Sequence, residues 1–233
     1  MEDMFCGYCG KEANPSEAKH QDVFVLLQPV LLYYFITLLL LGTYKFTEFF
    51  PTGLDGLLWI SLLDIIVVIA FWIYSGNELN PIWSLKGVKW YLIIATIVGA
   101  IIGSFVVTIV ANLINISIND DVFYNTYLFE DTPYPLLFSI LFIAVQPAIF
   151  EEVVFRGFLF NGIKKVTNAS GAIYTSAFLF GIMHLQIISL LWLIPLGLVF
   201  ALMRNKYNTL WYGIVGHFTY NLCITLDEFM HWY

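Results

Sequence analysis

Seven long apolar segments, separated by short polar stretches, follow one another along the chain. A transmembrane helix needs about 20 mainly apolar residues, with a range of about 17 to 25. The segments that reach or approach this length are residues 23–44, 56–75, 90–118, 134–160, 170–186, 188–203 and 209–226. The pattern therefore predicts an all-α, polytopic bundle with about seven transmembrane helices.

The boundary between the fifth and sixth segments is the least marked. Residues 172–203 are almost continuously apolar, and only Gln186 and Ser189 interrupt the run. A single helix over the whole run would leave the chain with six spans instead of seven. We expect a tight turn near these two polar residues, which splits the run into two antiparallel helices.

The positive charges test this division, because Lys and Arg concentrate in cytoplasmic loops. With seven spans and the N-terminus inside, only Lys45 falls in an outer segment, and Arg156 lies within a span. The cations on the cytoplasmic side are then Lys11, Lys19, Lys86, Lys89, Lys164, Lys165, Arg204 and Lys206. Fusing the fifth and sixth segments would move Arg204 and Lys206 to the other side. The asymmetry favours seven spans with the N-terminus inside.

The composition agrees with a location in the lipid bilayer. Of the 233 residues, 60% are hydrophobic and 12% are charged, and the mean hydropathy is +0.80. Soluble domains are about 45–50% apolar and about 25% charged. The net charge is −7, and no basic cluster is longer than Lys164 and Lys165. Because binding to a phosphate backbone requires many cations, we expect no nucleic-acid partner.

The N-terminal segment, residues 1–22, is polar and lacks the features of a cleavable signal peptide, so the first apolar segment is expected to remain as a span. This segment holds Cys6 and Cys9, whose CxxC spacing is that of half a zinc ribbon. The second CxxC is absent. Three interpretations stay open: a degenerate remnant, a shared or intermolecular zinc site to which His20 could contribute, and redox chemistry.

Six residues in the fourth, fifth and seventh predicted spans are candidates for a polar site. A charged residue near the bilayer centre costs at least about 2.5 to 3.5 kcal/mol, so such residues are functional candidates unless they pair. The fourth, fifth and seventh spans contribute Glu151, Glu152, Arg156, His184, His217 and Asn221. At about 1.5 Å per helical residue, Glu151, His184 and Asn221 lie about 20 Å from the cytoplasmic end, and His217 lies about 6 Å shallower. The three spans can therefore converge on one site.

Helix geometry gives the two adjacent glutamates different roles. Arg156 lies about 40° around the helix axis from Glu152 but about 140° from Glu151, so Arg156 is expected to pair with Glu152. Glu151 is left without a cation on its own helix, which suits a general base that takes a proton from water. Pro147 lies four residues before Glu151, so the carbonyl of Ile143 loses its helical partner and the helix is expected to open.

These residues form three motifs in chain order: EExxxR at 151–156, FxxxH at 180–184 and HxxxN at 217–221. The set resembles the CPBP family, the CAAX proteases and bacteriocin-processing enzymes, and the resemblance covers about 134–226. It implies catalytic spans there, after N-terminal membrane spans over 23–133. It also implies that Glu151 activates water with help from His184, and that His217 and Asn221 stabilise the oxyanion.

A metal requirement remains open at this point. Glu151, His184 and His217 are a plausible zinc set, and the family is commonly labelled as metalloproteases. However, Asn221 is a poor zinc ligand, and Glu151 cannot easily act both as a ligand and as a free base. A metal-free glutamate mechanism is therefore slightly favoured. Asp64, in the second span, is expected either to pair with a cation or hydroxyl group or to line the cavity.

The resemblance implies an intramembrane endopeptidase that hydrolyses a peptide bond in a membrane-anchored protein or peptide precursor. The abundance of Asn, Ile and Phe indicates a bacterial protein. Peptide maturation or bacteriocin immunity is then favoured over the processing of prenylated CAAX proteins. The alternative is a non-catalytic membrane scaffold or binding protein in which the same residues serve as hydrogen bonds between helices.

Overall fold

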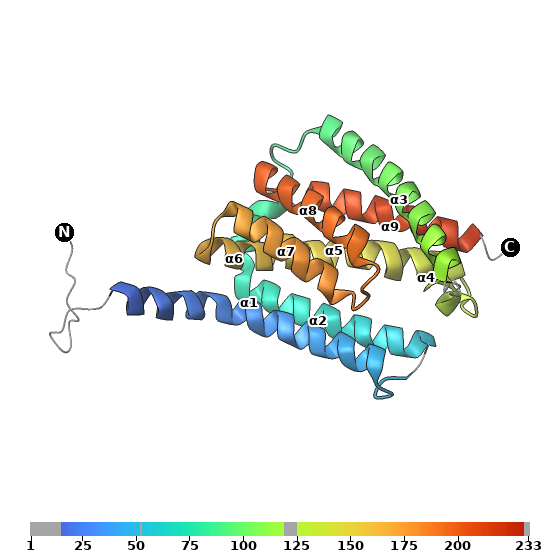
Figure 1. Cartoon of the computed structure of the whole chain (residues 1–233), viewed down its shortest axis with the longest axis horizontal. Helices are drawn as coiled ribbons and strands as arrows, with labels where there is room; N and C mark the ends of the chain where they lie inside the picture. Colours follow the sequence, from blue (N-terminus) through green and yellow to red (C-terminus); the bar gives the residue numbers. More distant parts are fainter. Residues whose placement is uncertain (1–14, 52, 119–124, 231–233) are drawn as a thin grey trace.

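The computed structural model describes residues 15–51, 53–118 and 125–230, and Figure 1 shows them as a bundle of long helices. Cys6 and Cys9 lie outside the described residues, so the interpretations of the CxxC segment stay predictions. The secondary structure of the described residues is helical throughout. It consists of α1 (Pro15–Phe46), α2 (Gly53–Leu79), η1 (Asn80–Trp83), α3 (Trp90–Ile118), η2 (Asn125–Phe129), α4 (Pro135–Ser139), η3 (Ile140–Val145), α5 (Gln146–Glu151), η4 (Glu152–Leu159), α6 (Phe160–Val166), α7 (Ala169–Met183), α8 (Leu190–Tyr207) and α9 (Trp211–Met230).

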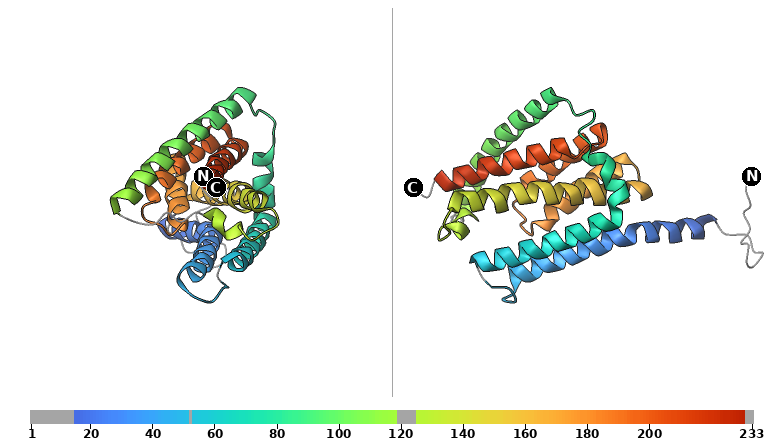
Figure 2. Two further views of the ribbon diagram at one scale, coloured as in Figure 1. Left: turned by 90° about the vertical axis from the view of Figure 1, so that its right-hand side faces the viewer. Right: turned by 180° about the vertical axis from the view of Figure 1, so that it is seen from behind.

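The five consecutive elements from α4 to α6 form one continuous helical rod, so the described chain contains seven long rods. Each rod runs antiparallel to the one before it along the long axis of the molecule, as Figures 1 and 2 show. α1 begins at one end of the bundle and α9 ends at the other. The seven rods match the seven predicted segments, which confirms the all-α polytopic bundle.

The expected tight turn between the fifth and sixth segments is present. α7 ends at Met183 and α8 begins at Leu190, and the two helices pack against each other as a hairpin. Leu185 in the connection has a φ of 53°, in the left-handed region that only short turns commonly use. The prediction of two helices in this apolar run is confirmed.

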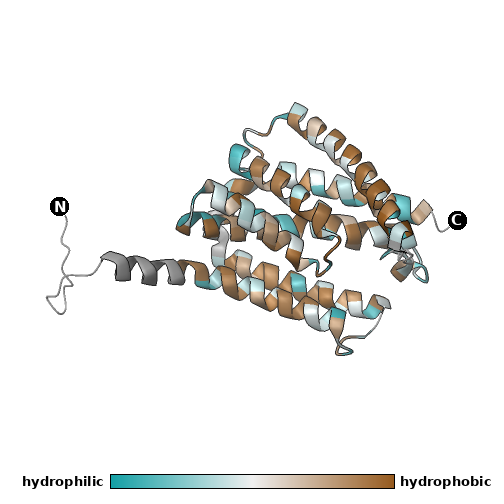
Figure 3. Ribbon diagram, viewed as in Figure 1, coloured by the Kyte–Doolittle hydropathy of each residue, from teal (hydrophilic) through white to brown (hydrophobic). Residues whose placement is uncertain are grey.

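The outer surface of the bundle suits a lipid environment. Large apolar side chains point outward on many helices, including Phe35, Ile73, Ile102 and Ile116, and Figure 3 shows apolar residues along most of the ribbon. Five of the rods, α1, α2, α3, the α4–α6 rod and α8, are long and apolar enough to cross a membrane. α7 is shorter, with 15 residues. α9 is less apolar because it carries His217, Asn221 and Asp227. The chain is a multi-pass membrane protein.

The α4–α6 rod lies at the centre of the bundle and positions the polar residues. It contacts α1, α2, α7, α8 and α9. Two of its segments, η3 before Pro147 and η4 after Glu151, are π-helical. A π-helix is rare and frequently marks a functional site. All eight residues of η4 are buried, so the widened helix places Glu152 and Arg156 in the interior of the protein.

Candidate active site

Glu152 and Arg156 form a buried ion pair at the centre of the bundle. Arg156 Nη1 donates to Glu152 Oε1 over 2.7 Å, and the side chains of Arg156 and Glu152 are 1% and 0% exposed. This contact confirms the pairing predicted from helix geometry. Arg156 also donates to the carbonyl of Gly197 on α8 over 3.4 Å, and its guanidinium lies over the ring of Phe180, 4.3 Å from the centroid.

His217 on α9 connects this ion pair to the second glutamate. Its Nδ1 lies 3.3 Å from Glu152 Oε1, the same oxygen that accepts from Arg156. Its Nε2 lies 3.8 Å from Glu151 Oε2. Because an ionised carboxylate only accepts hydrogen bonds, Nδ1 of His217 must donate, and Nε2 is the nitrogen turned toward Glu151.

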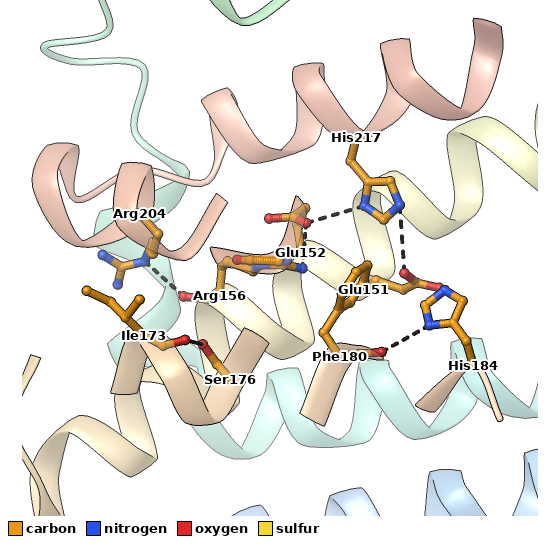
Figure 4. A network of polar contacts seen from close by, with 10 residues as sticks. Glu151, Glu152, Arg156, Ile173, Ser176, Phe180, His184, Arg204 and His217 are labelled. Carbon is orange, nitrogen blue, oxygen red and sulfur yellow. Dashed lines mark hydrogen bonds and ion pairs between the residues drawn. The ribbon is translucent and has the colours of Figure 1, made fainter. Parts of the chain in front are cut away.

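Glu151 differs from its neighbour in exposure. The side chain of Glu151 is 30% exposed, whereas that of Glu152 is 0% exposed. Oε2 of Glu151 is buried without a hydrogen-bond partner, so the exposure belongs to the rest of the side chain. Figure 4 shows this carboxylate between the rings of His217 and His184. Of the two glutamates, Glu151 is the one that a reactant can approach.

His184 is the C-terminal cap of α7, next to the left-handed Leu185. Its Nδ1 lies 3.0 Å from the carbonyl oxygen of Phe180. Since a carbonyl only accepts, Nδ1 carries the proton and Nε2 of the neutral ring is an acceptor. Lys45 at the end of α1 donates to the carbonyls of His184 and Leu185, over 3.4 Å and 3.0 Å, and so ties α1 to this connection.

Phe180 is the aromatic centre of the site. Its ring makes edge contacts with His184 and His217, at centroid distances of 5.0 Å and 5.8 Å, in addition to the contact with Arg156. Phe200 of α8 stacks on the other side of His217, with a centroid distance of 5.9 Å. The phenylalanine of the FxxxH motif thus packs against three of the polar motif residues.

Asn221 has a different partner from the one that the resemblance implies. Its side-chain Nδ2 donates to the carbonyl oxygen of Ile143 over 3.0 Å, in the helix turn before Pro147. The amide is therefore directed at the backbone of the central rod. The structure brings Glu151, Glu152, His184 and His217 together around one point, and Asn221 contacts the rod on the other side of Pro147.

Comparison with known proteins relates this part of the chain to membrane peptidases. Residues 133–223 match the family described as Type II CAAX prenyl endopeptidase Rce1-like. Over 104 residues the chain is 26% identical to YdiL of Bacillus subtilis (strain 168), a candidate membrane peptidase by its name.

Over residues 133–223, the chain is similar to the CPBP family of membrane peptidases.

The curated match covers 45% of this chain and 43% of the relative, so it spans less than half of the relative's length. No solved structure matches the chain. The match to the CPBP family and the three motifs cover the same part of the sequence, from the beginning of α4 into α9. The relative from Bacillus agrees with the expected bacterial source.

The side chains of the zinc set considered above, Glu151, His184 and His217, lie near one another but are not placed as a metal site. Among the described residues, no group of three or more His, Cys, Asp and Glu side chains is placed to hold a metal ion. Nδ1 of His184 and Nδ1 of His217 are turned to Phe180 and Glu152 instead. Asp64 of α2 lies near enough to Glu151 for their charges to interact, which places it beside the site.

Three residues that support the site were not singled out from the sequence. A Cβ atom at Gly213, one turn before His217, would overlap the carboxylate of Glu152. Arg204 of α8 donates through Nε to the carbonyl of Arg156 over 2.9 Å, as Figure 4 shows. Phe200 stacks on His217. The sequence offered one signal, for Gly213 alone: Gly213, His217 and Asn221 recur every four residues on α9 and therefore share a face.

Proposed function

We propose that this protein is an intramembrane endopeptidase of the CPBP type in which Glu151 activates water. The observation that carries the proposal is the position of Glu151: a carboxylate that is 30% exposed, next to a histidine that a fully buried ion pair holds in place. The match of residues 133–223 to a peptidase family supports this activity. Because the curated match is partial, the activity, substrates and partners of the whole protein are part of this proposal.

The order of charges explains how such polar groups are tolerated inside a bundle. Arg156, Glu152, His217 and Glu151 follow one another as neighbours. With His217 protonated, each charge in this row lies beside one of opposite sign, and the row as a whole is neutral. In a low-dielectric interior, an isolated charge would be costly, whereas paired charges are stabilised. The row fixes the ring of His217 beside Glu151, the carboxylate at the exposed end.

In the reaction that we propose, Glu151 takes a proton from water as the water oxygen attacks the carbonyl carbon of the peptide bond. His217 donates from Nε2 to the oxyanion that forms, and the acceptor Nε2 of neutral His184 orients the attacking water. When the C–N bond breaks, Glu151 returns the proton to the leaving nitrogen. The products are a carboxylic acid and an amine, which exchange a proton to give carboxylate and ammonium, and the base is restored. Asn221 is omitted from this step because its amide already donates to Ile143.

We also propose that no metal ion takes part. The ground is the donor arrangement, because the three expected ligands do not form a metal-holding group and Glu151 serves here as the base. Stoichiometric zinc in active protein would overturn this proposal if zinc and activity were lost together on chelation and restored by zinc alone. Cys6 and Cys9 must be replaced for that measurement, so that metal bound by the CxxC segment is not counted.

The substrate that we propose is a peptide bond in a membrane-anchored protein or peptide precursor, close to the bilayer. A membrane-anchored segment can reach a bundle with an apolar outer surface from within the bilayer more readily than it can reach a soluble protein. The matched family's description refers to prenylated CAAX proteins. For a bacterial protein, we favour peptide maturation or bacteriocin immunity over the processing of prenylated CAAX proteins.

Cleavage of a library of membrane-anchored peptides by purified protein tests the function. We expect the wild type to cleave and Glu151→Gln to be slower by at least about 10²- to 10⁴-fold, the usual contribution of a general base. The variant should melt close to the wild type, because the buried pair beside it is intact. If folded wild type cleaves nothing, the same contacts serve as hydrogen bonds between helices, and the chain is a membrane scaffold or binding protein.

A further inference from the structure

The central rod has a break in its backbone hydrogen bonding just before the active site. Pro147 has no backbone N–H, so the α-helical partner of the Ile143 carbonyl is missing. The preceding segment, η3, is π-helical, and the N–H of Gln146 reaches back five residues to the carbonyl of Leu141. A carbonyl without a donor in an apolar bundle is unfavourable, since no water can replace the missing bond.

A side chain from another helix supplies a donor at this break. Nδ2 of Asn221 on α9 donates to the Ile143 carbonyl over 3.0 Å, between residues 78 positions apart in the sequence. The backbone carbonyl of Asn221 itself accepts from Thr225 Oγ1 over 2.8 Å. Asn221 is part of a regular helix, and its amide reaches across to the irregular one.

We infer that Asn221 is a positioning residue that replaces the N–H missing at Pro147 and thereby fixes Glu151. This inference rests on the proposed function, because it concerns the placement of the proposed base. α5 spans Gln146–Glu151. α9 contacts the rod on both sides of α5, through Asn221 at Ile143 and through His217 at Glu151 and Glu152. The two contacts together set the position of the short helix that ends in the base.

This role predicts a dependence of Asn221 on Pro147 that an oxyanion donor would not have. If position 147 carries an N–H, the Ile143 carbonyl regains its own helical partner, and the amide of Asn221 becomes dispensable. An oxyanion donor would be needed equally with either residue at position 147. The two roles therefore differ in whether substitutions at 147 and 221 interact.

A double-mutant cycle with Pro147→Ala and Asn221→Leu tests the inference, since leucine branches at the same carbon as asparagine but has no donor. A misplacement of about 1 Å can lower a rate by about 100-fold. We expect Asn221→Leu to lower kcat by about that factor with little change in KM, and to lower it by less than about tenfold when Ala stands at 147. A loss of the same size in both backgrounds would overturn the positioning role.

The melting temperatures of the same four proteins form a second cycle that needs no activity. We expect Asn221→Leu to lower the melting temperature with proline at 147 and to lower it much less with alanine. This cycle separates the two proposals, because it can succeed even if the wild type cleaves nothing. Equal shifts in melting temperature would overturn the inference, whatever the activity.

Hydrogen exchange covers the case in which a protein with alanine at 147 does not fold. In Asn221→Leu alone, we expect faster amide exchange in residues 141–152 and unchanged exchange in α7. Asn221→Asp is the matched variant, because an ionised aspartate keeps the shape but cannot donate, and it should show the same local increase. Exchange equal to that of the wild type in residues 141–152 would contradict the inference.

Discussion

Glu152 accepts a hydrogen bond from His217, over 3.3 Å, through the oxygen that also accepts from Arg156. Glu152 is therefore more than a partner for the arginine. Because its charge is held by Arg156, it fixes which nitrogen of His217 carries the proton toward the interior and which nitrogen faces Glu151. The ion pair and the proposed catalytic histidine are one structural unit.

The first prediction separates the stability of this unit from its role in orienting His217. Glu152→Gln leaves Arg156 uncompensated, and breaking a buried pair from one side costs about 3 to 5 kcal/mol. Adding Arg156→Met should recover part of the melting temperature, because no lone charge remains. Turnover should not recover with it, since His217 still lacks its carboxylate. Recovery of both properties in the double variant would show that Glu152 serves only the arginine.

The second prediction concerns Lys45, which donates to the carbonyls of His184 and Leu185. Lys45→Met removes both hydrogen bonds from the connection that carries His184. We expect turnover to fall several-fold, because a lost hydrogen bond typically costs about 1 kcal/mol. Lys45→Arg should retain most of the activity, because it can still donate. The matched control is Lys86→Met, at the other end of the bundle. Equal activity of Lys45→Met and Lys86→Met would exclude this role.

The seven helices and the Glu152–Arg156 pair could be predicted from the sequence because both depend on local information. Apolar length gives a span, and spacing along one helix gives a pair. The contact of His217 with Glu152 could not be predicted, because it depends on how two helices are rotated and how closely they pack. The partner of Asn221 was missed for the same reason, although Pro147 had already indicated a carbonyl without its donor.

The π-helical segments are a second feature that could not be predicted from the sequence. Regular α-helical geometry places Glu151 and Glu152 on different faces, so that Arg156 pairs with Glu152. The structure confirms this pairing. However, η4 is widened, and its backbone is held by a contact from another helix, the donation of Arg204 to the carbonyl of Arg156. Nothing in the local periodicity of residues 152–159 indicates this widening or the contact from the distant donor.

The third prediction is the orientation of the bundle in the membrane. Glu130 and Lys86 lie at opposite ends of the rods, next to η2 and in the connection between α2 and α3. In protein without native cysteines, a cysteine at Glu130 should react with an impermeant reagent in intact cells, and one at Lys86 only after permeabilisation. The reverse pattern would invert the orientation. Labelling of both from the same side would contradict a membrane crossing by α3 between the two positions.

The last prediction uses the close approach of α9 to the ion pair. A Cβ atom at Gly213 would overlap the carboxylate of Glu152, which is 0% exposed and has no room to move without breaking its contacts with Arg156 and His217. Gly213→Ala should therefore lower both turnover and melting temperature, by about 1 to 3 kcal/mol in stability, the usual cost of overpacking. Gly99→Ala is the matched control: Gly99 lies within helix α3 and has no neighbour within 4 Å of its Cβ position. That change should be neutral or slightly stabilising, because alanine is the better helix former by about 1 kcal/mol. If the two variants behaved alike, α9 would not be in close contact with Glu152, and the proposed orientation of His217 would fail with it.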